Sequence, residues 1–463
     1  MSLVVRPSQV PPLDTGFVPA SLWNRAYREA VRANGGGERI ALALRRTNGC
    51  VSVFHTEILP HSDRFAALSA RYCERLLKFL LWQRGGHHVT VAGNPGLARY
   101  LADTYSESGD RAFDSAFMGD RVYGAPMTFD CVPYNRAPEP IEAETALGRH
   151  LGGCRIGFDL GGSDRKCSAI IDGDVIHTEE VAWDPYFQEN PDYHLEGIDD
   201  ILRRAAERLP RVDAIGGSAA GVYVNNEVRV ASLFRGVKPE LFERRVRRIF
   251  FDLQKRWNDV PFVVVNDGEV TALAASMALG ANSVLGISMG TSQAGGYVTP
   301  EGKITDWLNE LAFAPVDFRA DAPLDEWSGD GGVGAQYFSQ QAVARLLPLA
   351  GIDVPPDMPH AHQLEYAQDL LAAGNFRARQ VFATIGTFLG YAVAHYADFY
   401  TLRHVLVLGR VTSGEAGDLI LNAARAALTA DFPDLADAIR LSLPDEQGKR
   451  HGQAVAAATL PAL

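Results

Sequence analysis

Two glycine turns in this chain carry the residue types that suit phosphate binding. Residues 159–163 read Asp-Leu-Gly-Gly-Ser, residues 290–292 read Gly-Thr-Ser, and each turn follows an apolar run. Glycine lets amide groups converge on an anion because no Cβ stands in the way, and the hydroxyls add further donors. We expect the turns to lie on two similar lobes that hold a polyphosphate, with the donors Gly161, Gly162, Ser163, Gly290, Thr291 and Ser292.

The first turn has a carboxylate, Asp159, where the second has Ser288. Mg²⁺ prefers octahedral oxygen ligands and gives up water reluctantly, so we expect Asp159 to hold Mg²⁺ through water. The second turn is expected to bind phosphate without a metal. Taken alone, either turn is also compatible with an ordinary hairpin, in which glycine adopts a positive φ and aspartate caps an amide.

A third candidate lies between the two turns, where Asn266 and Asp267 follow four apolar residues and open a predicted helix. A carboxylate at the end of a strand can align an acceptor hydroxyl and take its proton during phosphoryl transfer, which typically contributes ~10²–10⁴-fold. Asp267 is equally suited to be only the N-cap of its helix. Its place between the turns favours Asp267 as the general base, with Asn266 beside it in the acceptor site.

A further strand-to-glycine turn follows at residues 406–414 and contains Gly409 and Gly414. Such a turn is suited to a nucleotide base and ribose, although the pattern fits many α/β loops.

The elements that must position these residues alternate between strands and helices, which indicates an α/β protein with covered sheets. Each phosphate turn is predicted to join two strands, with a tight hairpin and a third strand following. Residues 126–140, which contain four prolines, are expected to form a linker or crossover. We expect three parts, at residues 1–150, 151–282 and 283–463. Apolar periodicity predicts helices over 21–32, 64–84, 196–209, 239–257, 269–279, 336–348, 362–373, 376–398 and 452–459, and further strands over 40–44, 51–54, 89–92, 212–216, 262–265 and 404–408.

Composition narrows the class of protein. The 463 residues are 47% apolar, enough to bury sizeable cores, and the formal charge of −12 argues against nucleic acid and anionic membranes as main partners. The chain shows neither a signal peptide nor a long apolar run, so a cytoplasmic enzyme is expected. The five cysteines are widely spaced and are expected to be free thiols.

Taken together, these motifs resemble the ROK family (repressors, open reading frames, kinases) of the sugar kinase, Hsp70 and actin superfamily. The resemblance implies two ribonuclease-H-like lobes around a cleft, plus an additional N-terminal α/β region. It also implies ATP-dependent phosphorylation of a monosaccharide or sugar derivative, with Asp267 as the base. The matching segments, in the family's order, are residues 159–163, 218–224, 266–274, 290–296 and 452–458.

Three departures from the family pattern affect the expected site. Two residues separate Ser163 from Lys166, where the family has a lysine directly after its hydroxyl residue; Lys166 is still given a phosphate role. Glu310 aligns with the segment that contacts the sugar, but the histidine of that segment is missing, and Glu310 is expected to touch a sugar hydroxyl. Residues 330–335 contain none of the family's zinc cysteines, so no structural zinc is expected. Asn225 and Asn226 are interpreted as turn residues.

Two other functions remain open at this point. The family includes sugar-sensing transcriptional regulators, which carry an N-terminal helix-turn-helix, whereas a hairpin and α/β alternation are predicted here. A superfamily ATPase without a sugar acceptor is the other possibility. The first 150 residues are expected to roof the sugar site, extend a sheet or form the interface of a homodimer, and the sequence does not choose among these roles.

Overall fold

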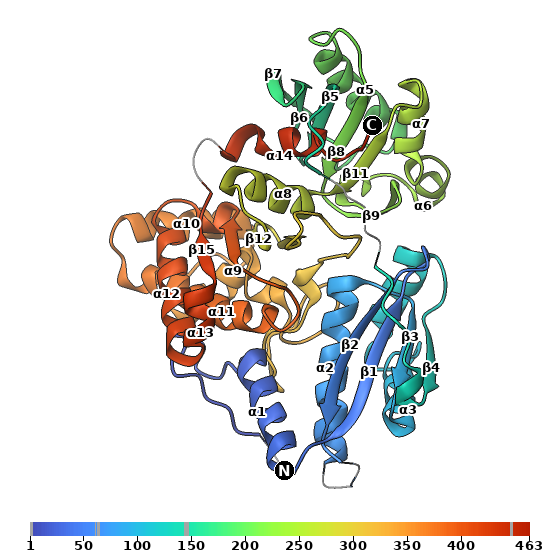
Figure 1. The fold of residues 1–463 in the computed structure, drawn as a ribbon. Coiled ribbons are helices and arrows are strands. Elements are labelled where there is room, and N and C mark those ends of the chain that lie inside the picture. Colours follow the sequence, from blue (N-terminus) through green and yellow to red (C-terminus); the bar gives the residue numbers. More distant parts are fainter. Residues whose placement is uncertain (1–2, 61, 63–64, 143–147, 445–447) are drawn as a thin grey trace. The chain divides into compact units, whose positions relative to one another are not determined.

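The computed structural model describes residues 3–60, 62, 65–142, 148–444 and 448–463 (Figure 1). They form two compact units that are described separately. The first unit comprises Met1–Ala143, Ile287–Ala294 and Trp307–Leu443, and the second comprises Glu144–Gly286, Gly295–Asp306 and Pro444–Leu463. The N-terminal region therefore shares a unit with the segment that begins at Trp307. None of the helices in the described part of the chain has the length and apolar composition that crossing a membrane requires.

The second unit is built on a five-stranded sheet of order β11-β8-β5-β6-β7. β5, β6 and β7 form an antiparallel meander, which is the predicted series of strand, turn, strand, hairpin and strand. β8 pairs parallel with β5, and β11 pairs parallel with β8. The strands span Cys154–Leu160 (β5), Asp164–Ile171 (β6), Asp174–Ala182 (β7), Ala214–Ala219 (β8) and Phe262–Asn266 (β11), with a small hairpin of Val222–Val224 (β9) and Glu227–Val230 (β10).

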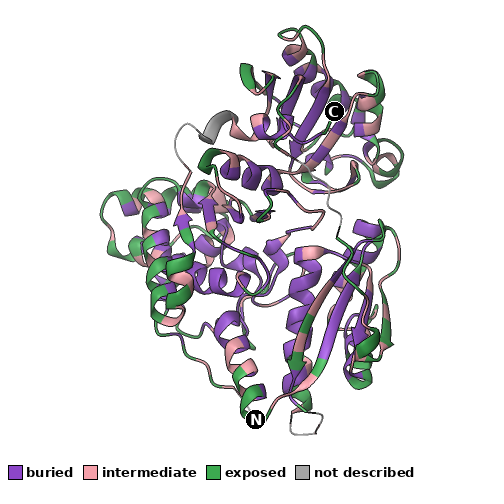
Figure 2. Cartoon of the chain, in the orientation of Figure 1, coloured by how far each residue is buried: buried purple, intermediate pink, exposed green. Residues whose placement is uncertain are grey.

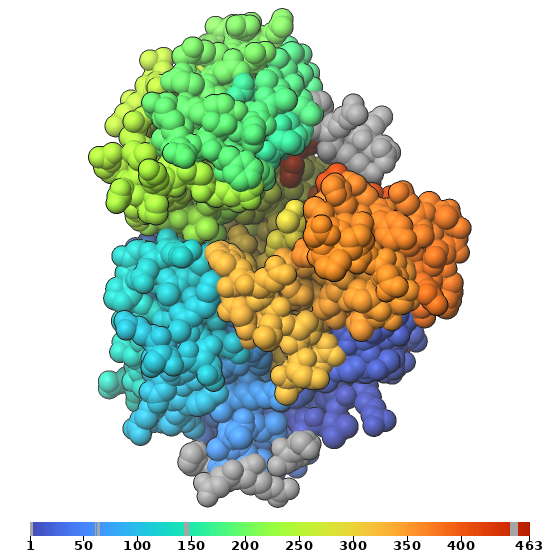
Figure 3. Space-filling view, turned by 180° about the vertical axis from the view of Figure 1, so that it is seen from behind, coloured from blue at the N-terminus to red at the C-terminus, as the bar shows by residue number. Residues whose placement is uncertain are grey.

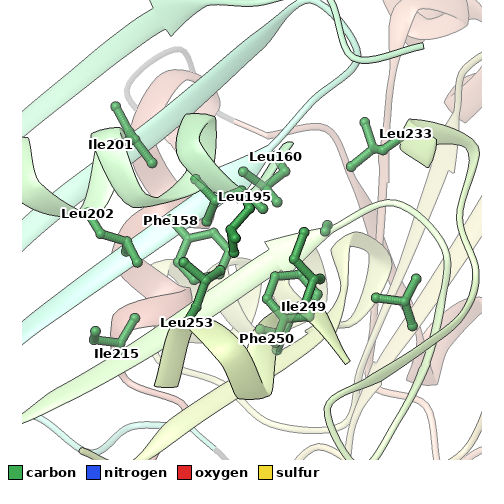
Figure 4. Close-up of a cluster of buried hydrophobic side chains, with 14 of the residues drawn as sticks. Phe158, Leu160, Leu195, Ile201, Leu202, Ile215, Leu233, Ile249, Phe250 and Leu253 are labelled. Carbon is green, nitrogen blue, oxygen red and sulfur yellow. The ribbon is translucent and has the colours of Figure 1, made fainter. Parts of the chain in front are cut away.

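One face of this sheet packs on an apolar core formed with the helices Pro191–Ala206 (α5) and Ile249–Arg256 (α7) (Figure 4). Phe158 of β5 lies in this core beside Phe250, with ring centroids 6.2 Å apart. Because side chains alternate along a strand, the next residue on either side of Phe158 faces away from this core. The central strands β5 and β8 are buried throughout, whereas the edge strand β7 is exposed or half-buried (Figure 2).

The opposite face of the sheet packs on the closing helix Gly448–Ala458 (α14). Gly157 of β5 and its neighbour Gly216 of β8 meet the backbone of this helix so closely that a Cβ at either position would overlap a carbonyl of Ala454 or Ala457. Glycine is therefore required there by the close approach of two backbones. The helix Asp267–Leu279 (α8) completes the unit beside α14.

The N-terminal region of the first unit has its own four-stranded sheet, of order β2-β1-β3-β4. The predicted hairpin is confirmed in β1 and β2. The linker predicted over residues 126–140 is wrong in part, because β4 forms there and pairs parallel with β3. The strands are Glu38–Arg45 (β1), Val51–Ile58 (β2), His88–Ala92 (β3) and Thr128–Val132 (β4), and the helices are Ala20–Ala33 (α1), Ala66–Arg84 (α2), Pro95–Thr104 (α3) and Ala112–Ala116 (α4), which runs into the π-helix Phe117–Tyr123.

A further four-stranded sheet has the order β13-β12-β14-β15 and contains the strands on either side of residues 290–292. The third strand predicted after its hairpin is not formed, since only an isolated bridge joins Val298 to Ile304 before the chain returns to the first unit at Trp307. The strands are Val284–Met289 (β12), Gln293–Val298 (β13), His404–Leu408 (β14) and Arg440–Ser442 (β15), and the helices are Gln340–Leu349 (α9), His360–Ala372 (α10), Phe376–Tyr396 (α11), Glu415–Asp431 (α12) and Pro433–Ala438 (α13).

The predicted helix over residues 239–257 is also interrupted. A short helix, Pro239–Leu241 (α6), leads into the π-helical turn Phe242–Val246, and regular α-helix resumes only in α7.

Candidate active site

The predicted metal ligand and the predicted base lie at one edge of the sheet in the second unit. Asp159 is near the carboxyl end of β5 and pairs across to Ser218 of β8, and Asn266 ends β11 opposite Ala219 of β8. The three strands are parallel, so their carboxyl ends share an edge, which is where open α/β sheets bind ligands. Asp267 follows immediately as the first residue of α8.

Asp159 is a buried carboxylate with a specific donor. The Ser218 hydroxyl donates to its Oδ1 at 2.6 Å, and the side chain is only 5% exposed. Burial raises the pKa of Asp159 to about 6, although the Ser218 bond and the nearby Lys166 ammonium oppose the shift. The negative charge of Asp267 raises it further. Asp267 is thus close enough for its charge to affect the ionisation of Asp159.

Lys166 lies directly opposite Asp159 on the antiparallel neighbour β6, which places both side chains on the same face. Its Nζ pairs with Asp164 Oδ1 at 2.7 Å. Burial alone would lower the pKa of Lys166, but the carboxylates of Asp164 and Asp159 more than offset this, and the pKa is raised. The pleat of β6 therefore brings a charged lysine to this edge in spite of the two intervening residues.

The first phosphate turn is a tight hairpin between β5 and β6. The Gly161 amide donates to the Asp164 carbonyl at 2.9 Å, so it is used within the turn itself. Trp183 donates from Nε1 to the Gly161 carbonyl at 2.8 Å, and the Ser163 hydroxyl donates to Asp164 Oδ2 at 3.0 Å. Among the described residues, the amides of Gly162 and Ser163 have no acceptor. The amides of Gly162 and Ser163 are therefore available to donate to a phosphate, whereas that of Gly161 already donates within the turn.

The end of β11 separates the roles of Asn266 and Asp267. Asn266 is the N-cap of α8: its Oδ1 accepts from the Gly268 amide at 2.7 Å, and its Nδ2 donates to the Gly221 carbonyl at 2.6 Å. The alternative in which Asp267 is the N-cap is therefore wrong. Asp267 is half-buried, also accepts from the Gly268 amide at 3.0 Å, and has its pKa raised by burial.

The second phosphate turn, residues 290–292, joins β12 to β13 and belongs to the first unit. The Gly290 amide donates to the Ser292 carbonyl at 3.0 Å, and the Gly290 carbonyl accepts from the Gln340 amide, beside the start of α9, at 2.9 Å. Thr291 and Ser292 are exposed. This turn thus presents two hydroxyl residues to solvent at the end of a buried strand.

The turn at residues 409–414 lies beside the second phosphate turn in the same unit. Gly409 has φ +101° and contacts the backbone of Met289, the residue before Gly290, so closely that a Cβ would overlap it. Its carbonyl accepts from the amide and the hydroxyl of Thr412, at 3.0 and 2.8 Å. Gly414, at φ +62°, precedes the first turn of α12. The structure therefore places the predicted nucleoside turn next to the predicted phosphate turn.

Glu310 is half-buried in the first unit and precedes a short 3₁₀ turn, Leu311–Phe313. Asn225 and Asn226 form the β9–β10 hairpin turn in the second unit, both at positive φ. Asn226 bonds the backbone of Phe262 and Val264, so its interpretation as a turn residue is confirmed.

The described residues contain no group of three or more His, Cys, Asp or Glu side chains placed to hold a metal ion. Mg²⁺ does not require such a group, because it is commonly held by one or two carboxylates together with water and substrate phosphates. A buried Asp159 near a second carboxylate matches that requirement. The residues present therefore fit an Mg²⁺ ion.

Sequence reasoning missed the role of Ser218. Residues 218–224 are one of the segments that resemble the family, but the bond of Ser218 to Asp159 depends on the register of β8 on β5, for which the sequence carries no local signal.

No protein-family model matches this sequence, and a comparison with curated proteins finds no relative. Solved structures do match. A ROK hexokinase from Thermus thermophilus has a TM-score of 0.52 and 18% identity, and the match covers 66% of this chain and 97% of that chain. The chain has the fold of the ROK sugar kinases. This confirms the predicted α/β fold class, and the uncovered third of the chain confirms an additional region.

Two further ROK structures have lower TM-scores. A ROK glucokinase from Streptomyces griseus, in complex with glucose and AMPPNP, is 20% identical, with coverage of 66% and 98% and a TM-score of 0.47. A ROK transcriptional regulator, a homologue of the E. coli MLC protein, is 16% identical, with coverage of 67% and 78% and a TM-score of 0.49.

Proposed function

We propose that this protein is a Mg·ATP-dependent kinase that transfers the γ-phosphoryl group to a hydroxyl of a monosaccharide or sugar derivative. One observation carries the proposal: Asp159 and Asp267 lie at the same sheet edge, close enough for the charge of one to raise the pKa of the other. A kinase needs two carboxylates with separate tasks there, one for the metal and one for the acceptor proton. The ROK-kinase fold supports this interpretation.

Asp267 is the proposed general base. Its neighbour Asn266 caps the helix, which frees the Asp267 carboxylate to accept a proton from the acceptor hydroxyl. Burial raises its pKa, and a base is most effective when its pKa lies near the working pH. Asn266, with both polar groups engaged, supports the acceptor site by fixing the start of α8.

Asp159 and Lys166 are the proposed phosphate-side groups. Asp159 would hold Mg²⁺, which when bound neutralises charge on the phosphate oxygens. Lys166 and the amides of Gly162 and Ser163 would bind phosphate oxygens directly. Ser218 keeps the Asp159 carboxylate in one orientation through its 2.6 Å bond.

The first unit carries the other proposed binding residues, each considered within that unit alone. Residues 290–292 would bind phosphate through the exposed hydroxyls of Thr291 and Ser292, and residues 409–414 would accommodate the nucleoside. Glu310 would accept a hydrogen bond from a sugar hydroxyl.

The proposal is tested by ADP release from ATP and Mg²⁺ against a broad panel of sugars and amino sugars. Asp267→Asn should lower kcat by ~10²–10⁴-fold with the best acceptor. Asp174→Asn is the matched control, because Asp174 is exposed on β7 of the same unit. If no acceptor gives turnover above the Asp267→Asn background, the kinase proposal fails and a binding role becomes the better account.

A further inference from the structure

The segment that carries Glu310 is bound by the N-terminal region. The amides of Asn309 and Glu310 donate to the carbonyls of Gln83 and Trp82, at 2.9 and 3.0 Å. Those carbonyls belong to the last turn of α2, where they have no acceptor role within the helix, since the final carbonyls of a helix lack an intrahelical partner. Glu310 is therefore attached through its own backbone to the end of a helix more than 200 residues earlier in the chain.

The residue three positions before Glu310 is held by the same region. The guanidinium of Arg84 lies 4.5 Å from the ring centroid of Trp307, and Trp307 Nε1 donates to Glu142 Oε2 at 3.1 Å. Glu142 in turn accepts from Arg46 at 2.7 Å and from the Ser52 hydroxyl at 2.6 Å. Helix α2 and the β1–β2 hairpin thus fix one flank of the segment.

The other flank packs on the buried ring of Trp82. The rings of Trp82 and Phe313 have centroids 4.4 Å apart, and Trp82 Nε1 donates to Asp114 at 2.6 Å. Asp114 is paired with the fully buried Lys78, whose Nζ also lies 3.1 Å from Asp330. On the surface of the first unit, the segment around residue 327 lies beside the residues near 115 (Figure 3).

Asn309 shows that the backbone next to Glu310 is tightly constrained. It is 1% exposed and has φ +49°, a left-handed conformation that asparagine adopts at some cost. Its Oδ1 accepts from the Tyr400 hydroxyl at 2.6 Å. The surrounding structure holds a strained residue beside a half-buried carboxylate, an arrangement typical of positions where side-chain placement matters.

We infer that the supports of the Asn309–Glu310 backbone, namely the end of α2 and the Tyr400 hydroxyl, set the position of the Glu310 carboxylate and thereby the affinity for the acceptor, with Tyr400 as a positioning residue. This inference rests on the proposed function, in which Glu310 contacts the acceptor. A hydrogen bond to a sugar hydroxyl requires the carboxylate to be placed within about 0.5 Å, which only a rigid support can ensure. Nucleotide binding involves other segments and should not depend on this support.

The test compares two tyrosine variants that each lose a hydroxyl. Tyr400→Phe removes the 2.6 Å bond to Asn309. Tyr391→Phe, at another buried tyrosine of the same unit, removes a 2.6 Å bond to Asp431 and a 3.1 Å bond from the Gln9 amide. Tyr400→Phe should raise the acceptor KM about five- to tenfold, while the KM for ATP and kcat change less than about twofold. Tyr391→Phe should leave all three constants unchanged, and both variants should have similar melting temperatures.

A double-mutant cycle then separates positioning from a general structural effect. In a Glu310→Gln background, Tyr400→Phe should no longer raise the acceptor KM, because the group that it positions is already altered. Additive effects of the two substitutions, or equal kinetics of the two tyrosine variants, would overturn the inference and leave the kinase proposal intact.

Sugar binding without phosphoryl transfer would also distinguish the kinase proposal from the inference about Glu310. If sugars bind in calorimetry but are not phosphorylated, the kinase proposal fails, and the same five- to tenfold loss of affinity in Tyr400→Phe supports the inference. If no sugar of the panel is bound or phosphorylated, both are overturned.

Discussion

At the scale of single residues, the burial of Asp159 has a clear effect on the free energy of unfolding. An isolated carboxylate is stable when ionised in water, and here its folded-state pKa is about 6 instead of the usual 3.8. Below both values it is protonated in the folded and unfolded states alike. As the pH rises through this window, the unfolded chain releases its proton first, so the stability contributed by this group falls between about pH 4 and pH 6 and stays low above it.

Asp159→Asn should therefore stabilise the protein without ligands at pH 8, by about 1–3 kcal/mol, because it removes a buried charge and keeps an oxygen that can accept from Ser218. The gain should be smaller at pH 5. Denaturant unfolding at the two pH values measures it. If the variant is less stable than the wild type at pH 8, burial of the ionised Asp159 carboxylate does not lower the stability of the protein. Mg²⁺-dependent turnover should be lost in the same variant.

The fall of kcat/KM at acidic pH should depend on the protonation of Asp159 and Asp267. Protonation of Asp159 removes the ligand for Mg²⁺, and protonation of Asp267 removes the base, so kcat/KM should fall as the pH drops through about 6. Ser218→Ala should move this fall to higher pH, because it removes a donor that stabilises the ionised form of Asp159. An unchanged pH dependence in this variant would contradict the assignment.

Among the elements, the contact between β5 and α14 determines where the site can form. Gly157 and Asp159 are two residues apart on one strand and so face the same side. The first of them lies against the helix, and the second lies near the carboxyl end of the strand. The close approach that glycine permits thus brings α14 up to the face of the sheet on which Asp159 lies.

Gly157→Ala should destabilise the second unit by about 2 kcal/mol or more, because the added Cβ meets the backbone of α14 and neither element has room to move. Gly152→Ala is the control: it lies just before the same strand, and a Cβ added there would have no neighbour within 4 Å. The control should change stability by less than about 0.5 kcal/mol. Thermal unfolding of both variants checks the prediction, which fails if they behave alike.

The sequence predicted the elements around the site better than the contacts within it. The apolar run before Asn266 correctly predicted β11 and the start of α8, but the choice of Asn266 as the cap depends on the local backbone and on the nearby Gly221 carbonyl. β4 was missed because it is a short strand without a buried residue, and its partner, β3, lies about 40 residues earlier. Long-range pairing leaves no local pattern.

At the scale of the whole molecule, the ion cluster around Lys78 joins the N-terminal region to the segment after Trp307. Lys78, Asp114, Arg75, Glu74 and Asp330 are all at most 8% exposed, and Arg111 pairs with both Glu74 and Asp330. No sequence pattern indicated that residues so far apart would meet, because charged residues are usually solvated. This is why three consecutive parts were expected and two interleaved units were found.

Lys78→Met should cost about 3–5 kcal/mol, because it leaves the carboxylates of Asp114 and Asp330 buried with less compensation. Arg410→Met, which removes an exposed ion pair with Glu365 in the same unit, should cost less than about 1 kcal/mol. Urea unfolding compares the two variants. Similar losses would mean that the buried cluster contributes no more than a surface pair.

The interleaving of the two units has a consequence for synthesis on the ribosome. Lys78 leaves the ribosome about 250 residues before Asp330, which at ~5–20 residues per second is roughly 10–50 s. During that interval Lys78 of α2 cannot pair with Asp330. The first unit cannot fold completely until residue 443 has been made. The second unit can complete its fold only later, because it contains α14, which follows residue 443 in the chain. Nascent chains of this protein should therefore stay sensitive to protease until α14 has been made.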